Sequence, residues 1–389
     1  MNRFKFVATT LFGLEDVLAG ELLKLGAENI FKRNRAVEFT GSLALMYKAN
    51  LCLRTALRIL LILKTFRVKS EDHLYDTLVN IEWETLFDQK YNFAVTPVVN
   101  SPKFRHSRFI AQKSKDAIVD RFRKATGSRP TVELSKPDIV INIHIDNELA
   151  NVGLDSSGEA LFKRGYRTES HQAPLNEVLA AGMILTSGWD GSTNFIDPMC
   201  GSGTLAIEAA MIGSGIFPGN FRKSYSFFNW KYFDRRLFEL VKGQLPAPQP
   251  TPGRVFASDL SPEALRQTRI NIKNASLDDY IITEEKDFRE YTPPPGGGIM
   301  MTNPPYGIRL EEADLNEFYR MIGNVLKSKY SGFHVWIISP NLEALKFVGL
   351  HPDKKLWLIN GDLKCRFNRY SIYEGSKKPE RVKKNPDSD

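Results

Sequence analysis

The stretch "NFIDPMCGSGTLAIEAA" at residues 194–210 decides the fold of the C-terminal half of this chain. An apolar run ends at an acidic residue, Asp197, and a turn containing Gly201 and Gly203 leads into a helical pattern from Thr204. Glycines let the backbone approach a ligand closely, and the first turn of a helix presents free N–H groups. The stretch therefore predicts a strand, a ligand-binding turn and a helix. The alternative is a purely structural turn.

The residues of this turn favour one kind of ligand. A phosphate-binding loop can be set aside because no Gly-Lys-Ser/Thr follows the glycines. An acid at the strand end would repel a phosphate but suits an ammonium group. That points to S-adenosylmethionine, which has a zwitterionic end and a positive sulfonium. The residues expected to bind it here are Asp197, Pro198, Met199, Cys200, Gly201, Ser202, Gly203 and Thr204.

A second strand, in "RVFASDLSPEALRQTRIN" (254–271), also ends in an acid, Asp259, followed by Leu260. An acid at the end of the second strand of a doubly wound sheet commonly accepts hydrogen bonds from ribose hydroxyls. Asp259 lies 56 residues beyond Gly203 (259 − 203), whereas about 20 would be usual. The excess predicts an insertion over residues 213–253.

The predicted insertion mixes aromatic with basic side chains, among them Arg222 and Lys223. Its aromatic residues are Phe217, Phe221, Tyr225, Phe227, Phe228, Trp230, Tyr232 and Phe233. Unpaired bases stack on aromatic rings beside cations, so one interpretation is an RNA-binding surface. The other, equally supported, is a flap whose rings pack inward and whose exterior is basic.

Two later strand ends complete the predicted site. In "EEKDFREY" (284–291), Asp287 precedes Phe288 and could accept the adenine amino group, although surface acids are common. In "GIMMTNPPYG" (298–307), an apolar strand stops at Asn303, Pro304, Pro305 and Tyr306. The Asn303 side-chain oxygen and the Pro304 carbonyl can accept hydrogen bonds from both N–H groups of an exocyclic amine. The prolines fix that carbonyl, and Tyr306 offers a ring for stacking.

From about residue 175, apolar strands alternate with helical patterns at 203–213, 262–275 and 313–328, which is typical of a parallel α/β sheet. The final "CRFNRYSIYEG" (365–375) is expected to be an edge strand, and the polar tail 376–389 to be disordered. The first 155 residues instead read as α+β. Their Ile139, Ile141, Ile143 and Ile145 alternate with polar neighbours, which predicts a half-buried strand.

A basic helix is predicted at 108–124, and its cations could neutralise RNA phosphates or could form a solvated face. The candidate RNA-binding residues in and around it, with two from the insertion, are Lys103, Arg105, Arg108, Lys113, Lys115, Arg121, Arg123, Lys124, Arg222 and Lys223. The formal charge of the whole chain is +8, which favours a polyanionic partner.

Composition excludes several classes of protein. No run of about 18 apolar residues suggests a membrane span, and the start lacks a signal-peptide pattern. Cys52, Cys200 and Cys365 lie far apart, so we expect neither a disulfide framework nor a metal site. A reducing, cytoplasmic compartment follows. The oligomeric state is not encoded in any pattern that we find.

The ordered motifs DPMCGSGT, ASDLS, KDF and NPPY resemble those of the class I S-adenosylmethionine-dependent amino-methyltransferases. The lead-in "LFKRGYRTESHQAPLNEVLAA" (161–181) and the first 155 residues are similar to THUMP-containing RNA methyltransferases, above all the bacterial large-subunit ribosomal RNA guanine-N2 methyltransferases. The resemblance implies a ferredoxin-like subdomain (1–57), a THUMP RNA-binding domain (58–160) and a Rossmann-like seven-stranded methyltransferase domain (161–375). It also implies that S-adenosylmethionine contacts the residues named above, Asn303 included.

The motifs leave the substrate open. NPPY also serves adenine-N6 and glutamine amides, and transfer RNA guanine-N2 methylation is the nearest rival. A non-catalytic, RNA-binding ribosome assembly factor is the alternative outside enzymes. The intact acids, glycines and NPPY argue against it. The resemblance favours methylation of guanine N2 in large-subunit ribosomal RNA.

Overall fold

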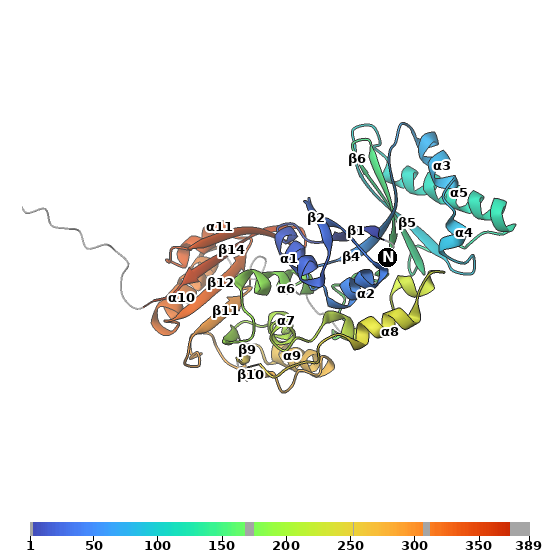
Figure 1. Cartoon of the computed structure of the whole chain (residues 1–389). Coiled ribbons are helices and arrows are strands. Elements are labelled where there is room, and N and C mark those ends of the chain that lie inside the picture. Colours follow the sequence, from blue (N-terminus) through green and yellow to red (C-terminus); the bar gives the residue numbers. More distant parts are fainter. Residues whose placement is uncertain (1–2, 168–174, 252, 306–311, 374–389) are drawn as a thin grey trace, which may run out of the picture.

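The computed structural model describes residues 3–167, 175–251, 253–305 and 312–373, and it contains two seven-stranded sheets. The chain is elongated, with the sheet of the C-terminal half at one end and helix α5 at the other (Figure 1). The strands of the N-terminal half are β1 (Phe4–Thr9), β2 (Glu28–Arg33), β3 (Ala36–Gly41), β4 (Arg58–Arg67), β5 (Phe93–Asn100), β6 (Ile139–Asp146) and β7 (Leu149–Asp155). Its helices are α1 (Glu15–Leu25), α2 (Leu43–Cys52), α3 (Glu71–Val79), α4 (Trp83–Leu86) and α5 (Ser107–Thr126).

The second sheet follows along the chain. Its strands are β8 (Asn194–Asp197), β9 (Val255–Asp259), β10 (Ile281–Glu285), β11 (Gly298–Thr302), β12 (Phe333–Ser339), β13 (Lys354–Asn360) and β14 (Leu363–Ser371). The helices are α6 (Glu177–Ser187), α7 (Thr204–Gly213), α8 (Arg235–Gly243), α9 (Pro262–Asn274), α10 (Glu312–Lys329) and α11 (Leu342–Phe347). Two short 3-10 helices, η1 (Pro218–Phe221) and η2 (Ser226–Asn229), precede α8.

The N-terminal sheet is continuous, in the order β2-β3-β1-β4-β7-β6-β5. Strand β4 joins its two parts, because it pairs antiparallel with β1 on one side and with β7 on the other. The family resemblance implies a boundary between a ferredoxin-like subdomain and a THUMP domain at residues 57 and 58. The structure shows that this position lies just before a strand that both parts share.

Strand β6 has the alternation that the sequence predicts, since its four isoleucines are buried while the residues between them face outward or are half-buried. Strand β2 was not predicted. It lies at the edge of the sheet and pairs only with β3, and Ile30 is its one partly buried position, so it carries no period-2 signal. Helix α3 was also missed, because its nine residues bury only Leu74 and Leu78 fully.

The second sheet has the order β10-β9-β8-β11-β12-β14-β13. Strands β8 to β12 pair in parallel and β14 runs antiparallel between β12 and β13, so the prediction that residues 365–375 form an edge strand is wrong. Strand β14 contributes Cys365 and Phe367 to one core and Tyr370 to the other, so it is covered on both faces as an interior strand is. Apolar residues of α6, α7 and α9 share one core with the sheet, and those of α10 and α11 share another.

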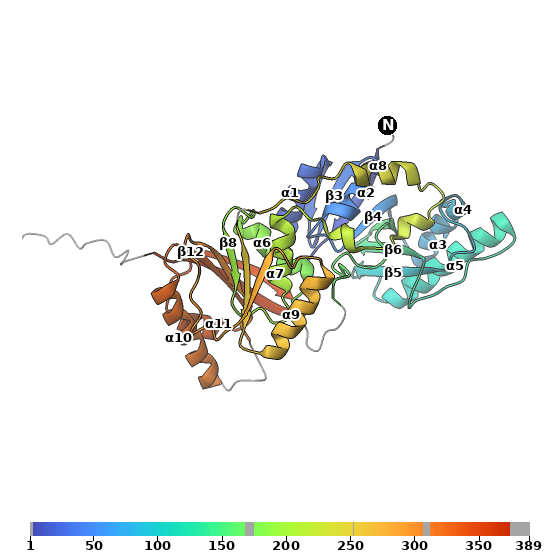
Figure 2. The ribbon, with the colours of Figure 1, turned by 90° about the horizontal axis from the view of Figure 1, so that it is seen from below.

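The predicted insertion forms a strap against the N-terminal half (Figures 1 and 2). Tyr225, Phe227 and Trp230 are buried in the N-terminal core, and the Phe227 ring lies 4.8 Å from that of Tyr47 in α2. The Lys231 amide donates a hydrogen bond to the Leu86 carbonyl (2.8 Å). Of the two interpretations of the aromatic residues, inward packing is therefore the one that the structure shows for these three rings.

The two halves also meet at the turn before α1. Leu14 is buried in the core of the second sheet, and a Cβ added at Gly182 of α6 would lie only 2.5 Å from a Leu14 methyl carbon. Gly13 has a left-handed backbone (φ +86°), and a Cβ there would meet the carbonyl oxygen of Trp357 in β13 at 2.5 Å. Both glycines are required by close packing between the halves.

Candidate active site

Three of the predicted motifs meet at the carboxyl edge of the second sheet. Strand β8 ends at Asp197, β9 ends at Asp259, and Asn303 follows the last residue of β11. Strand β8 lies between β9 and β11, so Asp197 has Asp259 on one side and Asn303 on the other. Parallel strands bring side chains that are far apart in sequence to one edge, where ligands of open α/β sheets bind.

Hydrogen bonds to neighbouring elements hold the glycine turn in place. The Gly201 amide donates to the Asp259 carboxylate (2.9 Å), and the Thr268 hydroxyl of α9 donates to the Gly201 carbonyl (2.7 Å). Gly203 is left-handed (φ +80°), and a Cβ there would lie 2.8 Å from the Thr268 methyl. Gly201 is also left-handed (φ +54°), yet nothing lies within 4 Å of its Cβ position. The turn is thus tight against α9 and open at Gly201.

Asp197 is buried, and its Oδ1 has no hydrogen-bond partner among the described residues. Burial raises the pKa of Asp197 well above its usual range, and repulsion from Asp259 raises it further. Two carboxylates so placed disfavour full ionisation unless a cation joins them. An ammonium or sulfonium group would supply the missing positive charge, so these residues fit the ligand that the sequence predicts.

Asp259 offers carboxylate oxygens to a ligand, whereas its neighbour Leu260 offers an apolar side chain. The Asp259 oxygens accept from the amides of Gly201 and Ser261 (2.9 Å each), and a carboxylate retains further lone pairs for a ligand. Leu260 is 66% exposed, which is unusual for a large apolar side chain beside a buried site. A flat apolar group such as a purine would cover it.

Asn303 has a second unpaired oxygen at this edge. Its Oδ1 is buried without a hydrogen-bond partner in the described part of the chain, as is the Thr302 hydroxyl. Buried amide oxygens are normally paired, so this oxygen points to an absent donor. Pro304 is buried and Pro305 is exposed, whereas Tyr306 lies outside the described residues.

The third predicted acid is already engaged. The Asp287 carboxylate accepts from the Arg289 guanidinium (3.0 and 3.1 Å) and from the Arg289 amide (2.8 Å). The hydrogen bonds from Arg289 lower the pKa of Asp287. Phe288 is buried among apolar residues beneath the sheet. Contact of these two residues with an adenine ring stays a prediction.

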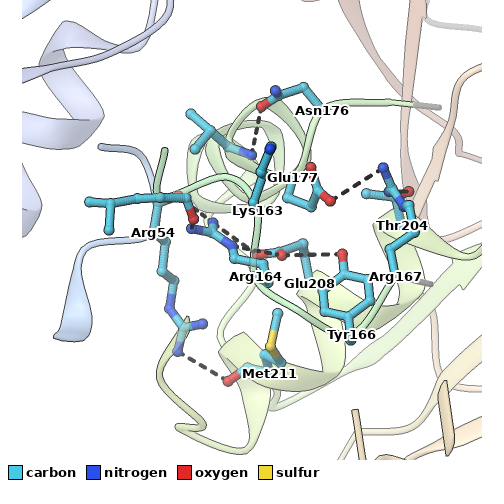
Figure 3. A network of polar contacts seen from close by, with 12 residues as sticks. Arg54, Lys163, Arg164, Tyr166, Arg167, Asn176, Glu177, Thr204, Glu208 and Met211 are labelled. Carbon is cyan, nitrogen blue, oxygen red and sulfur yellow. Dashed lines mark hydrogen bonds and ion pairs between the residues drawn. The ribbon is translucent and has the colours of Figure 1, made fainter. Parts of the chain in front are cut away.

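Sequence reasoning missed Arg167, which reaches the start of α7 from the lead-in segment (Figure 3). Its guanidinium donates to the Thr204 hydroxyl (2.7 Å) and forms an ion pair with Glu177 of α6 (3.2 Å). Arg167 therefore links α6 to the first residue after the glycine turn. No spacing in the sequence signals this link, because the three residues come from three separate segments.

A fully buried ion pair lies beneath the same helix. Arg164 and Glu208 of α7 are both 0% exposed and lie 3.2 Å apart. Arg164 also donates to the carbonyls of Leu161 (2.8 Å) and Arg54 (2.6 Å), and Arg54 in turn donates to the carbonyls of Met211 and Ile216 (Figure 3). This network joins the N-terminal half to the second sheet.

The predicted RNA-binding cations fall into three groups. Several pair with acids on their own surface: Lys103 with Glu148, Lys113 with Asp72, Lys115 with Asp116, Arg121 with Glu84, and Arg123 with Asp120. Four have no acidic partner within the described ranges, namely Arg105, Arg108, Lys124 and Lys223. Arg222 donates to the carbonyls of Ser157, Glu159, Ala160 and Lys163.

Arg222 thus holds the segment between the two halves in place, and any contact of Arg222 with RNA would have to compete with its hydrogen bonds to four carbonyls.

Among the described residues, no group of three or more His, Cys, Asp and Glu side chains could hold a metal ion. No helix in the described part of the chain is long and apolar enough to cross a membrane.

The strand order of the second sheet and the acids at its carboxyl edge define a class I methyltransferase fold, a class whose methyl donor is S-adenosylmethionine. The chain belongs to the family described as RMKL-like, methyltransferase domain, which matches residues 164–369. An RlmL ferredoxin-like domain matches residues 5–60 and a THUMP domain matches residues 68–155. The predicted family and fold class are confirmed.

Curated relatives extend over nearly the whole chain. "Ribosomal RNA large subunit methyltransferase K/L" of Syntrophotalea carbinolica is 37% identical over 95% of this chain, which spans 54% of that protein. "Putative RNA methyltransferase slr0064" of Synechocystis is 33% identical over 95% of this chain and 97% of its own length. The chain therefore spans about half the length of the K/L relatives that it matches.

Solved structures share the complete architecture. SMU.472, a putative methyltransferase complexed with SAH, superposes with a TM-score of 0.86 at 29% identity, covering 97% of this chain and 100% of that one. A predicted N6-adenine-specific DNA methylase from Listeria monocytogenes has a TM-score of 0.84 at 27% identity, covering 96% and 97%.

Proposed function

We propose that this protein transfers a methyl group from S-adenosylmethionine to the exocyclic N2 amine of a guanosine in large-subunit ribosomal RNA. The observation that carries the proposal is a pair of buried oxygens at one sheet edge, Asp197 Oδ1 and Asn303 Oδ1, which have no hydrogen-bond partner among the described residues. One oxygen belongs to an acid suited to a cation and the other to an amide suited to an N–H donor. A site for joining a cationic donor to an amine needs both.

S-adenosylmethionine, when bound, supplies an electrophilic methyl group on a positively charged sulfur. In the proposal, Asp197 and the glycine turn hold its amino-acid end, Asp259 accepts hydrogen bonds from its ribose, and Leu260 covers its purine. These roles agree with the raised pKa of Asp197 and with the exposure of Leu260. Binding of the cation stabilises the ionised form of Asp197 and so releases a proton at pH values below the raised pKa of Asp197 in the free protein.

In the proposal, Asn303 and Pro304 bind the exocyclic amine that receives the methyl group. The lone pair of an exocyclic amine is delocalised into the base, so the amine is a weak nucleophile. Accepting hydrogen bonds from both N–H groups, through the Asn303 side chain and the Pro304 carbonyl, orients the amine and stabilises the positive charge that develops on it. Preorganised acceptors of this kind require no covalent intermediate.

Ribosomal RNA is proposed as the substrate because of the relatives' printed names, the formal charge of +8 and the THUMP domain at residues 68–155. Such an enzyme acts where ribosomal RNA is made, in the cytoplasm. The assignment of guanine N2 as the target atom is based on the family resemblance. Methylation of adenine N6 is the second candidate, since the Listeria structure carries that description.

Nucleoside mass spectrometry tests the proposal. RNA from a deletion strain is separated into large-subunit ribosomal RNA and transfer RNA, and each is digested and compared with the parent strain. Loss of N2-methylguanosine from the large-subunit RNA alone is the expected result, with restoration by the wild-type gene as control. Loss of N6-methyladenosine, or loss confined to transfer RNA, would replace the proposal by the corresponding alternative.

A further inference from the structure

The hairpin of β13 and β14 places cations at the same edge of the sheet as the candidate site. Strand β14 pairs antiparallel with both β12 and β13, so β13 runs in the direction of β12 and ends at the carboxyl edge. The turn at Gly361 and Asp362 therefore lies at that edge. In register, Arg366 of β14 is opposite Ser339, the last residue of β12.

Three side chains of this hairpin form one cluster. Trp357 and Arg366 are direct register partners and Ile359 pairs with Lys364, so all these side chains point to one face. The Arg366 guanidinium carbon lies 4.0 Å from the centroid of the Trp357 ring, and Lys364 Nζ lies 4.4 Å from it. Contact with an aromatic face orders both cations, which otherwise have flexible side chains.

The two cations of this cluster have no acidic partner among the described residues. Neither Lys364 nor Arg366 forms an ion pair with an acid anywhere in the described ranges. At the far end of the same hairpin, by contrast, Arg369 pairs with Asp353 (2.5 Å). Ordered cations without a counter-charge create a positive field at the carboxyl edge.

The other face of the hairpin is fixed to the body of the protein. Leu358 and Cys365 are register partners buried in the core that also contains Leu14. The cluster is thus rigidly placed and is not a mobile arm. Lys364 and Arg366 lie on β14, two strands from β11, which is roughly 10 Å at the spacing of neighbouring strands.

We propose that Trp357, Lys364 and Arg366 form a phosphate-binding surface for the RNA strand that flanks the target nucleotide. The occupant is identified by charge complementarity, since a nucleic-acid backbone supplies the anions that the hairpin lacks. Two ordered cations at a fixed distance from the site would hold the strand while the target base enters. The inference rests on the proposed function only in taking RNA as the polyanion.

The test compares RNA binding by purified full-length variants in the absence of a methyl donor. The probe is a fluorescently labelled single-stranded 12-nucleotide RNA, titrated at salt concentrations between 50 and 200 mM. Loss of two phosphate contacts in Lys364→Gln/Arg366→Gln should weaken binding about 10-fold at the lower salt and reduce the salt slope by about 1.4, or 0.7 per contact. Trp357→Leu should weaken binding by a smaller factor, because the cations remain but are no longer ordered.

The matched control is Lys32→Gln/Arg33→Gln, which removes the same charge from β2, where both cations pair with acids. Wild-type affinity and slope in the hairpin variant would overturn the proposal, as would an equal loss in the control. Thermal melting excludes unfolding as the cause of a weaker signal. If the wild type binds RNA through the hairpin but methylates none, the proposed function fails and the RNA-binding surface stands.

Discussion

Two regions of this protein bury charge in opposite ways. Beneath α7, Arg164 and Glu208 are fully buried and paired, and the remaining donors of Arg164 reach carbonyl oxygens. At the carboxyl edge of the same sheet, Asp197 is equally buried, yet its Oδ1 is unpaired among the described residues. Both regions lie against one helix, at its body and its N-terminal end.

The presence or absence of a counter-charge within the chain distinguishes the structural ion pair from the candidate ligand-binding site. A buried charge that finds its counter-charge within the chain serves the folded state, because the pair is satisfied without any ligand. A buried acid that has no counter-charge within the chain destabilises the folded state. Such an acid is retained at sites where a ligand supplies the positive charge. Substitutions in the two regions should therefore have opposite effects on the stability of the free protein.

The largest effect is expected at the paired charge. Glu208→Gln leaves Arg164 without its counter-charge and should lower the free energy of unfolding by about 3–5 kcal/mol, measured by urea denaturation. Glu343→Gln is the control, because its partner Lys346 is exposed and such pairs contribute about 1 kcal/mol or less. A Glu208 variant as stable as the control would break the comparison.

The next effect concerns turnover. Asn303→Ala removes the proposed acceptor and should lower kcat for RNA about 10²- to 10³-fold, as measured for single preorganised groups in other enzymes. The Kd for S-adenosylmethionine should change little. Asn194→Ala, at the opposite end of β8, serves as control. Normal turnover by the Asn303 variant would remove this residue from the site.

Asp197→Asn should affect binding and stability in opposite directions. Loss of a charged hydrogen bond should weaken S-adenosylmethionine binding by about 1.5–3 kcal/mol, measured by calorimetry. The free protein should become more stable. The pKa of Asp197 is raised in the folded state, so the wild type loses stability as pH rises from the unfolded pKa through the folded one, and the variant does not.

The gain in melting temperature should therefore be larger at pH 8 than at pH 5. A variant that is destabilised at pH 8 would show that Asp197 has a partner in the free protein, and the contrast with Glu208 would disappear.

The smallest effect is expected at Arg167. A lysine at position 167 has a single ammonium group, so it cannot contact both Thr204 and Glu177 as the planar guanidinium does. Arg167→Lys should therefore raise the KM for S-adenosylmethionine about 5-fold with little change in kcat. Combining it with Thr204→Val tests the link. Coupling of about 1 kcal/mol between the two changes supports positioning through Thr204, whereas additive effects would contradict it.

Local sequence patterns predicted the strand–turn–helix units of the second sheet. Helices α7, α9 and α10 begin and end within one residue of the predicted ranges, because strand, turn and amphipathic helix follow one another. The placement of Asp197, Asp259 and Asn303 at one edge of the sheet could be predicted for the same reason, since the first two end strands and the third follows one. The acids at strand ends are visible in sequence, and the parallel sheet gathers them.

Contacts between distant segments were not predictable. Arg167, Thr204 and Glu177 meet only after three segments fold together, and β14 is interior because it pairs with β12 while the earlier strand β13 takes the edge of the sheet. The strap rings pose a different problem, because burial in a core and stacking on bases select the same aromatic side chains. Composition cannot distinguish the two.

The position of Leu14 affects how the molecule is made. This residue belongs to the N-terminal half but completes the core of the second sheet, beside Gly182 and Leu358. Synthesis proceeds from the N-terminus, and domains generally fold as they emerge. Leu14 is therefore made well before β13, and its side chain is fully covered only once the strands of the second sheet have been made.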